Sequence, residues 1–225
     1  MKKKTEFVCS ACGYSSPKWF GRCPSCGEWD TAREYKVPNK KQSGGREVIK
    51  PVALRDVFGD EQVLQRIPTG IGEVNRVLGG GFVPGSFILI GGEPGIGKST
   101  LLLQVCDFIA KEGRKVLYVS GEESVYQVSA RARRLGLDGT DMYILSEGGL
   151  ERIIEAIRDL HPDVVVVDSI QTVDVEDLDG TPGSVSLVRE SASRFLRLAK
   201  ELGCVIVIVG HITKSGEVAG PKTLE

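Results

Sequence analysis

The feature that most constrains this chain is the run Gly92-Glu93-Pro94-Gly95-Ile96-Gly97-Lys98-Ser99, which matches the pattern G-x4-G-K-[ST]. An apolar run at residues 87–90 precedes it and predicts a short buried strand, and residues 100–110 follow with the composition of a helix. A strand, a glycine-rich loop and a helix in this order make a P-loop, whose backbone N–H groups converge on phosphate oxygens at a helix N-terminus. The sequence therefore predicts a site for nucleotide phosphates within an α/β fold.

Two side chains of this motif are expected to carry most of its chemistry. Lys98 would reach the β- and γ-phosphates, and the hydroxyl of Ser99 would bind Mg²⁺. The expected ligands are therefore ATP and Mg²⁺. The candidate nucleotide-binding residues of the loop are Gly92, Glu93, Pro94, Gly95, Ile96, Gly97, Lys98, Ser99 and Thr100.

Three further apolar runs have the length of buried strands, at residues 116–119, 164–167 and 205–209. Between them, apolar residues recur at helical spacing in residues 150–160 and 188–202. Strands that alternate with helices predict a mainly parallel, doubly wound sheet. Because the strands are almost continuously apolar, both faces of this sheet are expected to be covered.

Polar residues end several of these strands at the edge where the P-loop lies. Asp168 follows four valines, as in a Walker B strand, and would hold Mg²⁺ through water. Glu122 and Glu123 are candidates to activate the attacking water, with Glu122 favoured, although both could instead be solvated acids at a helix start. His211 ends another strand, where it could sense the γ-phosphate, although a lone histidine is more often structural.

The front of the chain carries four cysteines with the spacing of metal ligands, Cys9-x2-Cys12 and Cys23-x2-Cys26. Two short turns of this kind can complete a tetrahedron of sulfur around one ion, and all-sulfur ligation favours Zn²⁺ over iron. A redox-active Cys-x-x-Cys is the alternative, and the paired spacing argues against it. The module is too short for its own core, so the metal would hold it folded. The aromatic residues Trp19, Phe20 and Trp29 are expected to pack on this site rather than stack on bases.

Charge and composition divide the chain further. Residues 1–50 hold 11 Lys or Arg against 5 Asp or Glu, which indicates either an anionic partner at the front or a solubilising linker. The polar stretch at residues 36–55, with Pro and Gly, predicts a linker. The sequence has no recognisable secretory signal and no membrane-spanning apolar run, and its cysteines have the pattern of reduced ligands. These features predict a cytoplasmic protein that is not in a membrane.

Taken in order, the motifs resemble those of the bacterial RadA (Sms) DNA-repair proteins. The four-cysteine module, the approach at residues 69–81, the P-loop and the strand ends at 118–124, 168–172 and 210–214 follow the same order. The resemblance covers essentially the whole chain. It implies a zinc module at residues 1–35, a linker at 36–55 and a RecA-like ATPase domain at 56–225. Members of that family continue with a Lys-Asn-Arg-Phe-Gly motif and a Lon-like domain, so this ATPase domain is expected to be C-terminally incomplete.

The resemblance implies a DNA-dependent ATPase of recombinational repair, which binds single-stranded or branched DNA and drives branch migration. It also implies a homo-hexamer, a recombinase partner, and DNA-facing loops at about residues 172–186 and 213–221, with Lys214 and Lys222 near phosphate. It assigns Lys98, Ser99 and Thr100 to nucleotide, Asp168 to magnesium and Glu122 to water activation. Two alternatives stay open. One is a KaiC-like, nucleotide-dependent oligomeric switch without DNA, and the other is a zinc-ribbon interaction module on a passive core.

Overall fold

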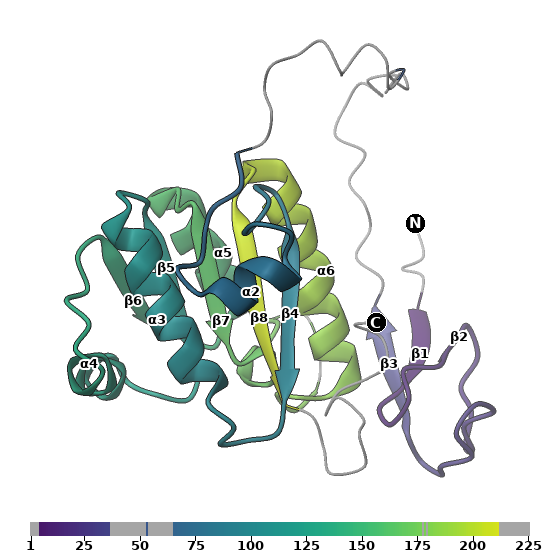
Figure 1. Cartoon of the computed structure of the whole chain (residues 1–225). Helices are drawn as coiled ribbons and strands as arrows, with labels where there is room; N and C mark the ends of the chain where they lie inside the picture. The colour runs from purple at the N-terminus through teal and green to yellow at the C-terminus, as the bar shows by residue number, and fades with distance from the viewer. Residues whose placement is uncertain (1–4, 37–52, 54–64, 177, 179, 212–225) are drawn as a thin grey trace.

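The computed structural model describes residues 5–36, 53, 65–176, 178 and 180–211. Most of the predicted linker, the predicted loop at 213–221, Lys214 and Lys222 lie outside these residues. The described part consists of a large α/β core and a small three-stranded sheet beside it, on the side of α6 (Figure 1). Among the described residues, no helix combines the length and the apolar character that a membrane crossing requires.

The core is one parallel sheet of five strands. Their spatial order is β4 (Phe87–Gly92), β8 (Val205–His211), β7 (Val164–Asp168), β5 (Val116–Ser120) and β6 (Met142–Ser146). The four strands predicted from apolar runs are present. Since all the strands run the same way, their carboxyl ends meet at one edge of the sheet.

Helices cover both faces of this sheet, as the continuous apolar strands predicted (Figure 1). Along each strand, alternate side chains enter one of two separate apolar clusters. One cluster joins the sheet to α3 (Lys98–Lys111), and the other joins it to α5 (Leu150–Leu160) and α6 (Val185–Leu202). The remaining helices in the described part of the chain are α2 (Gly72–Val77), α4 (Val125–Arg134) and the short 3₁₀ helix η1 (Ile170–Thr172).

Among the described residues, four elements of the core were not predicted from the sequence, namely β6, α4 and the short helices α2 and η1. Strand β6 contains the apolar run Met142-Tyr143-Ile144-Leu145, which the sequence analysis overlooked, and it forms an edge of the sheet, where it is only partly buried. Helix α4 buries a single residue, Val128. Its start is nevertheless marked in the sequence, because Ser124 and Gln127 form a reciprocal capping box.

The small sheet at the front is antiparallel, with the order β2 (Ser15–Ser16), β1 (Thr5–Cys9) and β3 (Ala32–Lys36). Gly13 and Gly27, which follow the second cysteine of each pair, have φ of 75° and 77°. These are the left-handed conformations expected of the metal-binding turns. We call residues 5–36 the ribbon.

The prediction that the tryptophans pack on the metal site is wrong. Trp19 is 62% exposed and Trp29 is 71% exposed, because four sulfurs and a short sheet leave no interior large enough for an indole. Phe20 does pack locally, against the edge of Tyr14, with ring centroids 5.7 Å apart. The guanidinium of Arg22 lies 5.8 Å from the centre of the Trp29 ring.

Candidate functional site

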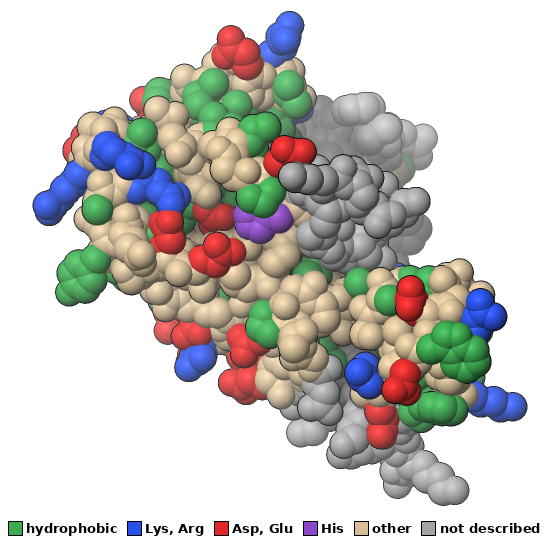
Figure 2. Space-filling view, turned by 90° about the horizontal axis from the view of Figure 1, so that it is seen from below, with side chains coloured by type: hydrophobic (Ala, Val, Ile, Leu, Met, Phe, Trp, Pro, Cys, Tyr) green, Lys and Arg blue, Asp and Glu red, His purple; other side chains and the backbone are tan. Residues whose placement is uncertain are grey.

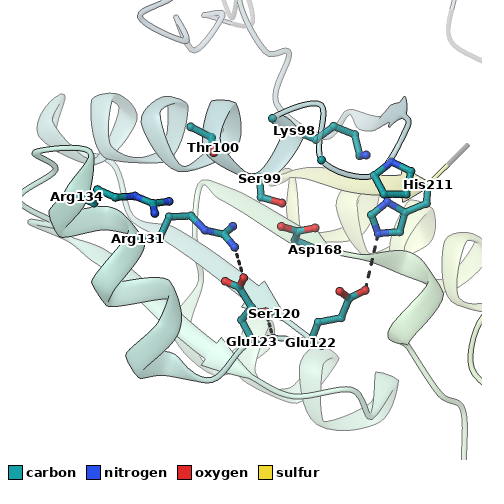
Figure 3. Close-up of a pocket in the computed structure, with 13 residues that line it drawn as sticks. Lys98, Ser99, Thr100, Ser120, Glu122, Glu123, Arg131, Arg134, Asp168 and His211 are labelled. Carbon is teal, nitrogen blue, oxygen red and sulfur yellow. Dashed lines mark hydrogen bonds and ion pairs between the residues drawn. The ribbon is translucent and has the colours of Figure 1, made fainter.

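The carboxyl edge of the core sheet carries a cavity of about 590 Å³ between the P-loop and the ends of β5, β7 and β8 (Figure 3). Most of the predicted nucleotide-site residues line it, together with three that the sequence analysis did not name, Ser120, Arg131 and Arg134. The lining residues are Pro94, Gly95, Gly97, Lys98, Ser99, Thr100, Ser120, Glu122, Glu123, Arg131, Arg134, Asp168 and His211. The predicted residues Gly92, Glu93 and Ile96 belong to the same loop but do not line the cavity.

The loop between β4 and α3 has the backbone of an anion-binding turn. Gly95 and Gly97 have φ of 80° and 102°, which residues with a side chain rarely adopt. Gly97 is the N-cap of α3, and among the described residues no side chain caps this helix. Its first N–H groups and its dipole therefore face the cavity as a site for phosphate.

Lys98 lies at the start of α3 and is only 8% exposed. Its Nζ donates to the backbone oxygens of Gly92 and Glu93, at 2.8 and 2.9 Å. The ammonium group thus holds the two ends of the loop together, at a place where phosphate oxygens can replace carbonyl oxygens as its acceptors.

Ser99 and Asp168 bring a hydroxyl and a carboxylate to the same cavity (Figure 3). Oxygen ligands of this kind suit Mg²⁺, which usually takes one or two protein groups together with phosphate oxygens and water. The chemistry of the pair therefore fits the predicted ion. The hydroxyl of Tyr118 donates to Oδ2 of Asp168 at 2.5 Å. Burial, followed by the charge of Asp168, raises the pKa of Tyr118, so this hydroxyl keeps its proton near neutral pH.

The two candidate acids differ in their surroundings (Figure 3). Glu123 forms an ion pair with Arg131 of α4, and its backbone N–H donates to the hydroxyl of Ser120 at 2.9 Å. The side chain of Glu122 is 59% exposed, and its Oε1 accepts a long hydrogen bond from Ser169 at 3.4 Å. Nε2 of His211 lies 3.8 Å from the same oxygen. Of the two acids, Glu122 has the less restrained carboxylate.

Close packing fixes the end of β5 beside the cavity. A Cβ at Gly121 would overlap Oγ1 of Thr172, so this position has no room for a side chain. The hydroxyl of Thr172 in turn donates to the backbone oxygen of Ser169 at 2.7 Å. These contacts bring η1 against the start of the segment that carries Glu122.

Arg131 and Arg134 were missed because α4 was not predicted, although the capping box of Ser124 and Gln127 would have revealed the start of this helix. Both arginines lie on the last turn of α4 and line the cavity, and Arg131 points toward Glu123 (Figure 3). Both guanidinium groups therefore add positive charge to a cavity that already suits an anion.

The four ribbon cysteines form a second site. Their Sγ atoms all lie within 4.8 Å of one another, with Cys9 to Cys26 at 3.7 Å and Cys12 to Cys23 at 3.5 Å. A tetrahedral zinc site with Zn–S bonds of about 2.3 Å has sulfurs about 3.8 Å apart. None of these cysteines is in a disulfide. The sulfurs thus fit Zn²⁺. Figure 2 shows the ribbon with acidic, basic and hydrophobic side chains interspersed on its surface.

The pKa values of two thiols in this cluster shift in opposite directions, since that of Cys9 is lowered and that of Cys26, which lies beside the other three cysteines, is raised to about 12. Burial alone would raise the pKa of Cys9, but hydrogen bonds with the Thr31 hydroxyl and the backbone N–H groups of Cys12 and Ala11 lower it to about 6. A cysteine that is a thiolate near neutral pH binds metal with less competition from protons. The other two cysteines, Cys106 and Cys204, are buried in the core, as expected.

Comparison with known proteins agrees with both sites. Residues 57–217 match the family described as AAA domain, and residues 7–34 match the family described as Rubredoxin metal binding domain. The chain is 48% identical over 233 residues to DNA repair protein RadA of Bacillus subtilis (strain 168), and 47% identical over 228 residues to that of Listeria monocytogenes. Both comparisons cover 100% of this chain and 50% of the relative. The chain therefore spans half the length of these curated relatives.

Solved structures share the fold of the core at low sequence identity. One solved ATPase domain superposes with a TM-score of 0.60 at 15% identity, covering 72% of this chain and 69% of that one. A KaiC-like protein from Pyrococcus horikoshii OT3 superposes with a TM-score of 0.54 at 20% identity, covering 66% and 72%. The predicted RecA-like α/β fold with a four-cysteine module is therefore confirmed. The chain belongs to the AAA domain family, and over its whole length it is similar to the DNA repair proteins RadA.

Proposed function

We propose that this chain is the ATP-hydrolysing part of a DNA-dependent ATPase that acts in recombinational DNA repair. The observation that supports the ATPase most directly is the convergence of Lys98, Ser99, Asp168 and Glu122 on one cavity at the carboxyl edge of the sheet. The repair function rests on the likeness to RadA proteins over the whole chain.

In this proposal the phosphates of ATP lie at the N-terminus of α3, and the ammonium of Lys98 binds β- and γ-phosphate oxygens. Mg²⁺, when bound by Ser99 and Asp168, would neutralise charge on the same oxygens. Glu122 orients a water molecule and takes its proton as the water oxygen bonds to the γ-phosphorus. The bond from that phosphorus to the β-phosphate oxygen breaks, which gives ADP and inorganic phosphate. His211, beside Glu122, would sense the γ-phosphate.

We assign water activation to Glu122 rather than Glu123. The carboxylate of Glu123 is held by Arg131, so accepting a proton there would weaken an ion pair. The contacts of the Glu122 carboxylate with Ser169 and His211 are long and therefore weak, so this side chain can turn toward a water molecule. Arg131 and Glu123 would then shape the cavity.

We propose that DNA contacts the basic N-terminal part of the chain, residues 1–50, rather than residues 172–186. Residues 172–186 contain four Asp or Glu and no Lys or Arg, so this predicted DNA-facing segment offers no cation to a phosphate. Residues 1–50 hold 11 Lys or Arg against 5 Asp or Glu. The single-stranded or branched substrate, branch migration, the hexamer and the recombinase partner stay implications of the likeness to RadA.

Replacing Lys98 by Ala tests the nucleotide site. We expect the affinity for Mg²⁺-ATP to fall about ten- to hundredfold, because charge-assisted hydrogen bonds contribute roughly 1.5–3 kcal/mol. The affinity is measured by titrating a fluorescent ATP analogue. Lys200→Ala, at an exposed position near the end of α6, is the matched control and should bind as the wild type does. Equal affinities of Lys98→Ala and wild type would show that the loop does not hold the phosphates.

A further inference from the structure

Tyr118 is a polar side chain within an otherwise apolar layer. It lies in the middle of β5 and is 1% exposed, and the cluster around it joins the sheet to α3. A phenylalanine ring would fill this space equally well, so the packing of the ring does not explain the hydroxyl group. The buried hydroxyl costs free energy unless it finds a hydrogen-bond partner, so its partner defines what it does.

That partner is the carboxylate at the end of the neighbouring strand. Tyr118 pairs in register with Val166 of β7, and its ring reaches two residues further to donate to Oδ2 of Asp168 at 2.5 Å. Within the described part of the chain, this is the only hydrogen bond to the Asp168 carboxylate. The carboxylate itself lines the cavity, near Ser99 (Figure 3).

We infer that Tyr118 is a positioning residue for the cation site: its hydroxyl binds Oδ2 of Asp168 and so fixes the orientation of the carboxylate that would serve a divalent ion in the cavity. The inference rests on the proposed function, because it takes Asp168 as the carboxylate that serves Mg²⁺. Outer partners of this kind orient a metal-binding side chain, and their loss typically lowers metal affinity or activity about ten- to hundredfold. The tyrosine acts from inside the core and touches neither the ion nor the nucleotide.

The test is Tyr118→Phe, which keeps the ring and removes only the hydroxyl. The measurement is the Mg²⁺ concentration that gives half of the maximal Mg²⁺-dependent binding of a fluorescent ATP analogue. We expect this concentration to rise about tenfold, while the affinity in the absence of Mg²⁺ stays the same. Tyr126→Phe, in a residue of α4 that is 86% exposed, is the matched control and should leave the Mg²⁺ dependence unchanged. Thermal melting of both variants checks that they are folded.

A second pair of variants separates positioning from general stability. In Asp168→Asn, the added change Tyr118→Phe should cause no further shift in the Mg²⁺ dependence, because the carboxylate that it positions is gone. An equal shift in both backgrounds, or no shift in Tyr118→Phe alone, would overturn the inference and leave the proposed function intact. If the wild type shows no Mg²⁺-dependent nucleotide binding at all, the proposed function fails together with the inference.

Discussion

Glu122→Gln is expected to lower ATP turnover by roughly 10²- to 10⁴-fold, the usual contribution of a positioned general base. Glutamine keeps the size of the side chain and can still orient a water molecule, but it cannot take the proton. Binding of Mg²⁺-ATP should stay within a few-fold of wild type, since the polar partners of the Glu122 carboxylate are Ser169 and His211, which lie outside the P-loop. The measurement is steady-state release of phosphate, with the binding titration run on the same samples.

The matched control is its neighbour, Glu123→Gln. This change also removes one carboxylate charge from the cavity, but the carboxylate that it removes is already paired with Arg131. We expect Glu123→Gln to lower ATP turnover clearly less than Glu122→Gln does. The remaining loss would come from Arg131, whose guanidinium is no longer held by an ion pair. If Glu123→Gln abolished turnover while Glu122→Gln retained most of it, the two roles would be reversed and the contacts of the two acids would be a poor guide to their chemistry.

Removal of zinc is expected to unfold the ribbon and leave the core folded. Structural zinc contributes about 10–16 kcal/mol of apparent binding free energy in small zinc-binding peptides, far more than a sheet of this size can supply. The chain has only two tryptophans, Trp19 and Trp29, and both lie in the ribbon. Their fluorescence therefore reports on the ribbon alone, and far-ultraviolet circular dichroism reports mainly on the core.

Chelation, or the substitution Cys9→Ser, should abolish the bound zinc, lower the anisotropy of tryptophan emission and make the ribbon sensitive to protease, whereas the emission wavelength should change little because Trp19 and Trp29 are already largely exposed. Cys204→Ser changes a cysteine of the core and should keep one zinc per chain. Nucleotide binding should survive zinc removal, because no ribbon residue lines the cavity among the described residues. A ribbon that keeps its tryptophan anisotropy and its protease resistance after complete chelation would contradict a structural role for the metal.

Local sequence patterns were enough to predict much of this molecule. Short runs of residues predicted the strand, loop and helix of the P-loop, the place of Asp168 at the end of a strand and four of the five core strands. The two cysteine pairs likewise predicted a tetrahedral cluster, and their Sγ atoms lie where zinc requires them. These features depend on residues that are adjacent or nearly adjacent in the chain.

The features that were missed depend on contacts between distant parts of the chain. The hydrogen bond from Tyr118 to Asp168 spans 50 residues and becomes visible only once β5 and β7 lie side by side. Arg131 reaches the cavity from α4. This helix is so polar, with Val128 as its single buried residue, that no helical apolar pattern was recognised in its sequence. The exposure of Trp19 and Trp29 follows from the lack of interior space in the ribbon, which the sequence pattern did not reveal.

The most direct test of the proposed function is the anisotropy of a labelled single-stranded DNA titrated with this chain. The titration is run without nucleotide, with ADP and with a slowly hydrolysed ATP analogue, each at two salt concentrations. We predict binding that depends on the nucleotide and weakens steeply as salt increases, because Lys and Arg release counterions from the phosphates. No DNA binding in any nucleotide state, by a chain that still binds Mg²⁺-ATP, would contradict a DNA contact within these residues and favour a nucleotide-dependent switch.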